Sequence, residues 1–223
     1  MYQAPVLSPN ALHRNITVAT GASVVFVADA DGSIRKALEK PAAVAGWQVK
    51  DFGSAGLFGL HPAADTPSCL VLDISLPGSL QLQQRLAARR PDMPIICITD
   101  NVPVTVQAMK AGAVDALAKP VDTKQLVQSI EHAFQVSEAS LQQRNATRQL
   151  EDRYASLSQR ERQVMELVVS GRLNKQVGGD LGISEITVKA HRGRVMRKMN
   201  ARSLAALVKM AGQLQLTHAT GAH

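Results

Sequence analysis

Short apolar runs alternate with stretches of helical periodicity over residues 24–134 of this chain. The runs are rich in Val, Ile and Leu, and the longer stretches place apolar residues three or four positions apart. Such alternation predicts a mostly parallel sheet with helices on both faces, and excludes an all-α or all-β fold for this region. The expected strands are 24–29, 47–52, 69–73, 95–99 and 116–118, and the expected helices are 33–45, 80–90, 104–111 and 123–134.

Polar side chains stand where these predicted strands end. Asp29 and Asp31 close the first strand, Asp73 the third, Thr99 the fourth, and Lys119 the fifth. In open α/β sheets, functional groups gather at the carboxyl ends of the strands, so we expect these side chains to converge. Carboxylates can hold Mg²⁺, and a lysine and a hydroxyl can contact a phosphoryl group. The pattern favours phosphoryl transfer to Asp73.

The positive charge lies in the last third of the chain. The formal net charge is +7, yet residues 1–155 hold 14 basic and 14 acidic side chains, while residues 156–223 hold 11 and 4. This imbalance predicts two domains with different partners, the second of them suited to a phosphate backbone. No aromatic residue follows Ala155, which disfavours stacking on single-stranded bases. Duplex DNA is therefore the expected ligand.

Helix signals organise the basic region. Ser158 and Glu161 have the spacing of a capping box, Asn174 is a candidate cap of a second helix ended by Gly182, and Ser184 is a candidate cap of a third. Two short helices joined by so tight a turn, the second rich in Lys and Arg, predict a helix-turn-helix whose second helix enters the major groove.

The third helix has two expected faces. At 100° per residue, Val188, Val195 and Met199 share one stripe, which we predict to be buried. The other side would meet DNA through apolar contacts to thymine methyl groups and through basic contacts to bases or phosphates. The DNA-binding residues predicted on this helix are Ile186, Thr187, Lys189, Ala190, Gly193, Arg194 and Arg197.

The connector and the ends carry weaker signals. Residues 136–156 are rich in Gln and Arg, which favours a semi-rigid helical linker over a disordered tether, although the apolar stripe is thin. The sequence shows no membrane span and no signal peptide, and its two cysteines, Cys69 and Cys97, lie in apolar runs. We therefore expect a cytoplasmic protein with reduced thiols.

Three segments, VFVADADGSIRKAL, CLVLDISLPG and AMKAGAVDALAKP, resemble the receiver domain of bacterial two-component response regulators over residues 23–135. The resemblance implies a five-stranded, doubly wound, flavodoxin-like α/β sheet, with a cis bond before Pro120. It makes Asp73 the phosphoacceptor and Thr99 the switch hydroxyl. Including Asp31, which stands one position after the family's second acid, we expect the pocket to be Asp29, Asp31, Thr99 and Lys119, and the metal ligands to be Asp29, Asp31, Asp73 and the carbonyl of Ser75.

This receiver departs from the family pattern at three positions. Ala30 stands where the family has its metal-ligating second acid, so we expect weak Mg²⁺ binding. Ala116 replaces the aromatic residue that moves with the switch hydroxyl, and Pro41 interrupts the first predicted helix. Two hypotheses remain open. Phosphorylation of Asp73 controls the protein, or the receiver keeps the fold only for dimerisation or protein docking.

Residues 157–211 resemble the LuxR-type helix-turn-helix, and the whole chain resembles the FixJ/NarL group. The resemblance implies a DNA-binding transcriptional regulator, not an enzyme, which works with promoter DNA, a sensor histidine kinase, RNA polymerase and a second copy of itself. It places Asn174 and Lys175 on phosphates. It makes the last helix a dimerisation helix through Leu204, Leu207, Val208 and Ala211.

The sequence thus divides into five expected parts, and one of them has a weakness. Gly178 and Gly179 lie inside a predicted helix, which predicts a soft DNA-binding domain. The parts are an N-terminal extension (1–22), a receiver (23–135), a helical linker (136–156), an all-α helix-turn-helix domain (157–215) and a tail (216–223).

Overall fold

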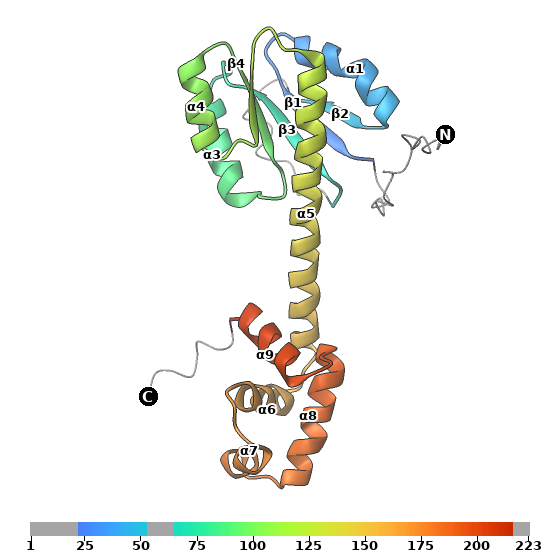
Figure 1. Ribbon diagram of the computed structural model, residues 1–223, viewed down its shortest axis with the longest axis vertical. Helices are drawn as coiled ribbons and strands as arrows, with labels where there is room; N and C mark the ends of the chain where they lie inside the picture. The colour runs from blue at the N-terminus through green and yellow to red at the C-terminus, as the bar shows by residue number, and fades with distance from the viewer. Residues whose placement is uncertain (1–21, 53–64, 216–223) are drawn as a thin grey trace, which may run out of the picture. The chain divides into compact units, whose positions relative to one another are not determined.

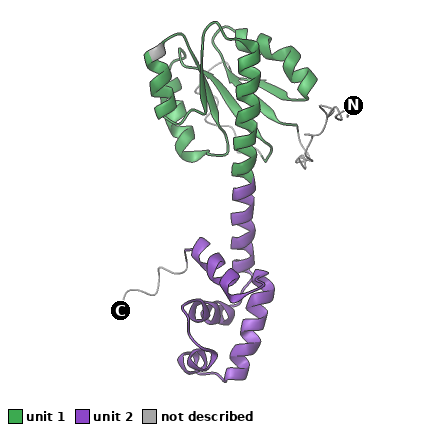
Figure 2. Ribbon diagram, in the orientation of Figure 1, with its two compact units in different colours: residues 1–141 green, residues 142–223 purple. Residues whose placement is uncertain are grey.

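The computed structural model describes residues 22–52 and 65–215. The chain divides into two compact units, Met1–Leu141 and Gln142–His223, which we call unit 1 and unit 2 (Figure 2). Residues 1–21 of the predicted extension, and the predicted tail, lie outside the described residues. In the parts of the chain that are described, no helix has the length and apolar character needed to cross a membrane.

Unit 1 contains a five-stranded parallel sheet in the order β2-β1-β3-β4-β5, which confirms the predicted fold class (Figure 1). In register, Asp73 pairs with Ile98 and Thr99 pairs with Ala118, so the carboxyl ends of these strands meet at one edge. The strands are β1 (Val24–Ala28), β2 (Gln48–Asp51), β3 (Ser68–Asp73), β4 (Ile95–Thr99) and β5 (Asp115–Ala118).

Helices cover both faces of the sheet. Helix α1 (Ser33–Ala45) and the start of α5 (Thr123–Ala155) pack on one face through Leu38 and Leu126, and α3 (Ser79–Arg89) and α4 (Val102–Lys110) pack on the other through Leu82 and Ala108 (Figure 1). The central strands β1, β3 and β4 are buried on both faces, which explains why their sequences are continuous apolar runs.

Helix α1 continues through Pro41 without a break, so the expected interruption is absent. Proline removes the hydrogen bond to the carbonyl four residues earlier, and its ring crowds that carbonyl. The buried side chains of Ile34, Leu38 and Ala42 hold the helix on the sheet across that point. Burial of this apolar stripe offsets the local cost.

Helix α5 is one continuous helix from Thr123 to Ala155. The predicted helix over 123–134 and the predicted linker therefore form a single element, which confirms the helical form of the connector. Two of its apolar residues, Leu141 and Leu150, are buried, whereas residues between them are mostly exposed. The last turns of α5 belong to unit 2, because Leu150 and Tyr154 pack in its core.

Unit 2 is all-helical. Helix α6 (Gln159–Val169) begins at the predicted capping box, in which Ser158 accepts the Glu161 N–H and Glu161 accepts the Ser158 N–H. Helices α7 (Asn174–Leu181) and α8 (Glu185–Met199) form the helix-turn-helix, and α9 (Leu204–Gln213) follows. The prediction that Asn174 caps α7 is wrong, because Asn174 is the first residue of the helix and its side chain accepts from Arg192.

The two glycines of α7 differ in their surroundings. A Cβ on Gly178 would lie 2.7 Å from the carbonyl oxygen of Ile183, because the helix passes close to the turn before α8, whereas a Cβ on Gly179 would meet nothing within 4 Å. The close approach of the Ile183 carbonyl thus explains why residue 178 is a glycine, and the sequence alone does not reveal this contact. Only at Gly179 does the structure leave the low helix propensity of glycine as a net cost to stability.

We predict opposite effects from the same substitution at these neighbouring positions. Gly178→Ala should lower the free energy of unfolding of unit 2 by about 1–2 kcal/mol, because backbone must move to admit the methyl group. Gly179→Ala should raise it by about 0.5–1 kcal/mol. Urea unfolding followed by helical circular dichroism compares the two variants with wild type, and shifts of the same sign would contradict the prediction.

Candidate functional site

The predicted pocket forms at the carboxyl edge of the sheet around Asp73. The Asp73 side chain is fully buried at the end of β3. Its Oδ2 accepts a hydrogen bond from Lys119 Nζ at 2.6 Å, and its Oδ1 accepts from the Ser75 N–H at 2.9 Å and the Ser75 hydroxyl at 2.7 Å. Burial raises the pKa of Asp73, but the hydrogen bonds from Lys119 and Ser75 outweigh burial and lower it overall. Asp73 is therefore held as a carboxylate.

Lys119 interacts with all three acids of this pocket. The hydrogen bond to Asp73 is the largest cause that raises its pKa, and the negative charges of Asp73, Asp31 and Asp29 raise it further. The charges of the three acids that the strand ends predicted thus all act on Lys119. The resulting site has a partly exposed cation beside a buried carboxylate, an arrangement suited to a phosphoryl group.

The two remaining acids have different local roles. Asp29 is buried, and its Oδ2 accepts the N–H of Ile34 at 2.8 Å, which ties it to the start of α1. Asp31 is exposed and accepts the N–H of Ser33 at 2.9 Å, and hydrogen bonds from the Ser33 hydroxyl and then from this N–H lower the pKa of Asp31. Among the described residues, no group of three or more His, Cys, Asp or Glu side chains is arranged to hold a metal ion.

Thr99 and Lys119 lie on adjacent strand ends, where the Lys119 N–H donates to the Thr99 carbonyl at 3.0 Å. The Thr99 hydroxyl accepts the N–H of Asn101 at 3.1 Å, which leaves its own hydrogen able to donate. The Lys119–Pro120 bond is cis, as the family resemblance implied. Ala116 packs against the core on the α3 and α4 side of the sheet.

Helix α8 has the two faces that its sequence predicted. Val188, Val195 and Met199 are buried. Thr187 is half-buried, and its hydroxyl lies 2.8 Å from the Ser184 hydroxyl that caps the helix. The other residues predicted to meet DNA from this helix are exposed, namely Ile186, Lys189, Ala190, Gly193, Arg194 and Arg197.

Several cations of unit 2 have internal partners. Lys189 pairs with Glu185 one helical turn away at the surface, and Lys198 pairs with the buried Glu161. Arg160 donates to the carbonyl of Leu181, and Arg162 lies over the Tyr154 ring. The capping box identified Glu161 from sequence, but no sequence signal identified its contact with Lys198, which lies 37 residues away.

The predicted dimerisation face of α9 divides into two. Leu207 and Ala211 are buried in the core of unit 2, whereas Leu204 and Val208 are each 39% exposed. Leu207 and Ala211 therefore pack within the chain, and only Leu204 and Val208 are open to a partner. At the start of α7, Lys175 is exposed and Asn174 is half-buried against Arg192.

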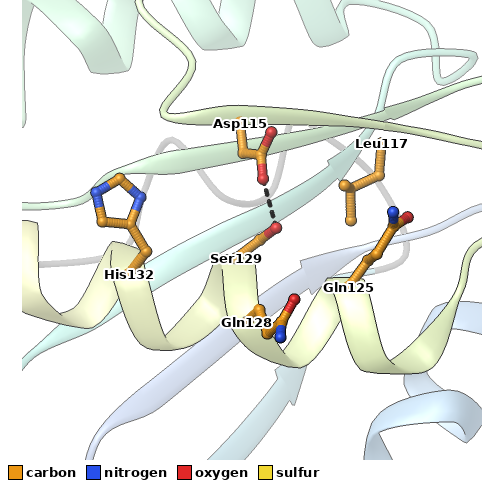
Figure 3. Close-up of a pocket in the computed structure, with 6 residues that line it drawn as sticks. All are labelled: Asp115, Leu117, Gln125, Gln128, Ser129 and His132. Carbon is orange, nitrogen blue, oxygen red and sulfur yellow. Dashed lines mark hydrogen bonds between the residues drawn. The ribbon is translucent and has the colours of Figure 1, made fainter.

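A separate hollow of about 360 Å³ lies between β5 and α5 (Figure 3). The Ser129 side chain on α5 points toward Asp115 on β5 and donates a hydrogen bond to it at 2.5 Å. Five of the six lining residues are polar, whereas small-molecule sites are mostly apolar, so the lining does not favour a small-molecule site here. The lining residues are Asp115, Leu117, Gln125, Gln128, Ser129 and His132.

Residues 25–131 match the family model of the response regulator receiver domain, and residues 155–211 match that of bacterial regulatory proteins of the luxR family. Nodulation protein W of Bradyrhizobium diazoefficiens is 41% identical over 205 residues, 90% of each chain. The transcriptional regulatory protein FixJ of Azorhizobium caulinodans is 39% identical over 191 residues, 84% of this chain and 90% of that one. The low-resolution structure of the response regulator StyR has a TM-score of 0.74 and 41% identity, covering 86% of this chain and 100% of that one.

A parallel sheet with an acidic pocket, joined to a basic helix-turn-helix, is the architecture of a DNA-binding regulator. The matches cover both parts and most of the chain. The chain belongs to the FixJ/NarL group of two-component response regulators, with a receiver domain and a LuxR-type DNA-binding domain. The receiver lies in unit 1, and the DNA-binding helices lie in unit 2.

Proposed function

We propose that Asp73 accepts a phosphoryl group from a phosphohistidine of a sensor kinase and that this modification controls binding to promoter DNA. The P–N bond of the donor breaks as a P–O bond to Asp73 forms, so the receiver is modified once and does not turn over a substrate. The observation that carries the proposal is the Lys119 ammonium 2.6 Å from a fully buried Asp73 carboxylate. Such a cation neutralises an incoming phosphoryl group.

Mg²⁺ would be held by few protein ligands. The donor set that fits it is the carboxylates of Asp29 and Asp73 with the carbonyl of Ser75, because Mg²⁺ binds one or two carboxylates and completes its shell with water and phosphate oxygens. Asp31 is exposed and already accepts the N–H of Ser33 at the start of α1, and the side chain of Ala30 has no oxygen. We therefore propose weak binding, with the ion supplying positive charge near the transferred group.

Thr99 would donate its hydroxyl hydrogen to a phosphoryl oxygen, and Lys119 would pair with another. Ala116 provides no aromatic ring to move with Thr99, so we propose that the signal leaves the pocket through the backbone of β4 and β5, which the Lys119 N–H links at the Thr99 carbonyl. Two copies would then associate through the receiver, the exposed Leu204 and Val208 of α9, or both.

The second step would be DNA recognition in the cytoplasm, where promoter DNA and RNA polymerase are found. Helix α8 would lie in the major groove with its exposed face toward the bases, and Asn174 and Lys175 at the start of α7 would contact phosphates. This assignment is supported by the exposure of the cationic side chains Lys189, Arg194 and Arg197 on one face of α8.

Beryllofluoride with Mg²⁺, which mimics the phosphoryl group, tests the receiver directly. We expect light scattering to show a Mg²⁺-dependent shift from monomer to dimer in the wild-type chain and no shift in Asp73→Ala. Acetyl phosphate should give the same shift together with a mass increase of one phosphoryl group. An unchanged mass distribution, with DNA bound regardless, would establish a receiver that has kept the fold without the chemistry.

A further inference from the structure

Lys198 lies in the last turn of α8, yet its ammonium group is bound to the domain itself. Its Nζ donates to Oε2 of Glu161 at 2.6 Å and to the carbonyl of Ser156 at 3.0 Å. The side chains of Glu161 and Lys198 are 5% and 40% exposed, whereas those of Glu185 and Lys189, which pair on the same helix, are 46% and 61% exposed. Lys198 thus makes a tertiary contact.

The Glu161 carboxylate connects two parts of unit 2. The same Oε2 that accepts from Lys198 also accepts the N–H of Ser158 at 2.9 Å. Ser156 and Ser158 form the turn between α5 and α6, because α5 ends at Ala155 and α6 begins at Gln159. Lys198 therefore joins the carboxyl end of α8 to this turn directly at Ser156 and, through the Glu161 carboxylate of α6, indirectly at Ser158.

Apolar packing also holds this end of α8. Leu150 from the end of α5 shares one buried cluster with Val195 and Met199 of α8, and Tyr154 packs against that cluster. The carboxyl half of α8 is thus held both by the apolar cluster and by the polar contacts of Lys198. The helix is about 22 Å long at 1.5 Å per residue, so a small tilt at this end displaces the residues at its other end.

We propose that Lys198 is a positioning residue, which sets the angle of α8 by holding its carboxyl end on the α5–α6 turn and makes no phosphate contact. The inference rests on the proposed role of α8 in the major groove. Helix α5 begins in unit 1 and ends at this turn, so the same contact also holds α8 next to the end of α5. Loss of the contact should disturb base recognition and leave general phosphate attraction intact.

Lys198→Met and Arg197→Met test this role as a matched pair. Arg197 is the adjacent residue on α8, and its exposed guanidinium has no ion pair or hydrogen bond within the described residues. The probe is a 30-bp duplex selected by the wild-type chain from a randomised pool, compared with a scrambled duplex by fluorescence anisotropy at several KCl concentrations. Circular dichroism confirms that each variant retains its helices.

For Arg197→Met we expect the logarithmic salt slope to become shallower by about 1 on both duplexes. For Lys198→Met we expect an unchanged salt slope and an approximately tenfold loss of preference for the selected duplex. Lys198→Arg, which keeps a cation facing Glu161, should restore most of the preference. Glu161→Gln should cause the same loss of preference for the selected duplex without leaving a buried charge unpaired. It replaces Lys198→Met in the test if that variant does not fold.

The outcomes separate this inference from the proposed function. A salt slope that falls in Lys198→Met as much as in Arg197→Met would show a phosphate contact and overturn the positioning role alone. Unchanged preference in both Lys198→Met and Glu161→Gln would also overturn it. A wild-type chain that selects no duplex would overturn DNA binding itself, and the positioning role with it.

Discussion

Replacing Lys119 by Met is expected to lower the free energy of unfolding of unit 1 by about 3 kcal/mol at pH 7, near the lower end of the range for breaking a buried ion pair. The Asp73 side chain is fully buried, and Lys119 supplies the only cation within ion-pair distance among the described residues. Methionine keeps most of the aliphatic stem but leaves the carboxylate without its counter-charge. Because Lys119 is 31% exposed, we do not expect the upper end of the range.

The double variant Lys119→Met/Asp73→Asn provides the control. Its neutral amide removes the unpaired charge, so most of the lost stability should return, with a coupling energy of about 2 kcal/mol in the double-mutant cycle. Urea unfolding can be followed by the fluorescence of Trp47, the only tryptophan of the chain, which packs edge-on against Phe134 within unit 1. Additive effects of the two substitutions would show that Lys119 does not stabilise Asp73.

The pH dependence follows from the direction of the Asp73 shift. In wild type, the pKa of Asp73 lies below its ordinary value, so its interactions stabilise the fold above about pH 4 and are lost as the pH falls further. In Lys119→Met, burial without the cation raises the pKa of Asp73. The difference in stability between wild type and Lys119→Met should therefore be largest near neutral pH and shrink toward pH 4.

The alternation of patterns was sufficient to predict the sheet and its helices. β4 and α1 have the predicted bounds, and the other strands differ only at their ends, because continuous apolar runs mark strands buried on both faces. Strand β2 has the weakest pattern, since it lies at the edge of the sheet and is mostly exposed. The length of α5 was predicted in two parts, because its exposed middle lacks an apolar stripe.

The convergence of Asp29, Asp73 and Lys119 could be predicted because parallel strands bring their carboxyl ends to one edge. The hydroxyl contact of Ser75 with Asp73 depends on the conformation of the loop after β3, which the sequence does not specify. On α9, the helical period identifies the apolar positions but not which of them face the core, so the sequence does not separate the buried Leu207 and Ala211 from the half-exposed Leu204 and Val208. Tertiary contacts decide such questions.

Binding of the chain to duplex DNA is expected to weaken by about 10³-fold per protomer between 50 and 200 mM salt. Of the eleven basic residues in 156–223, Arg160, Arg162, Arg192 and Lys198 make contacts within the domain, which leaves seven for DNA, among them Arg172 and Lys189 in exposed ion pairs. If about six of these meet phosphates, counterion release gives a logarithmic slope of about −5. The exposed Lys189–Glu185 pair exchanges readily for a phosphate contact, since such surface pairs contribute little.

Fluorescence anisotropy with a 30-bp duplex over a KCl series measures this slope. Arg194→Gln, which removes an exposed cation from the outer face of α8, should make the slope shallower by about 1. Lys36→Gln removes an exposed cation from α1 in unit 1 and should leave the slope unchanged, because the excess positive charge of the chain lies beyond residue 155. A slope shallower than about −2 for wild type would contradict an interface built on phosphate contacts, since each contact contributes nearly one unit.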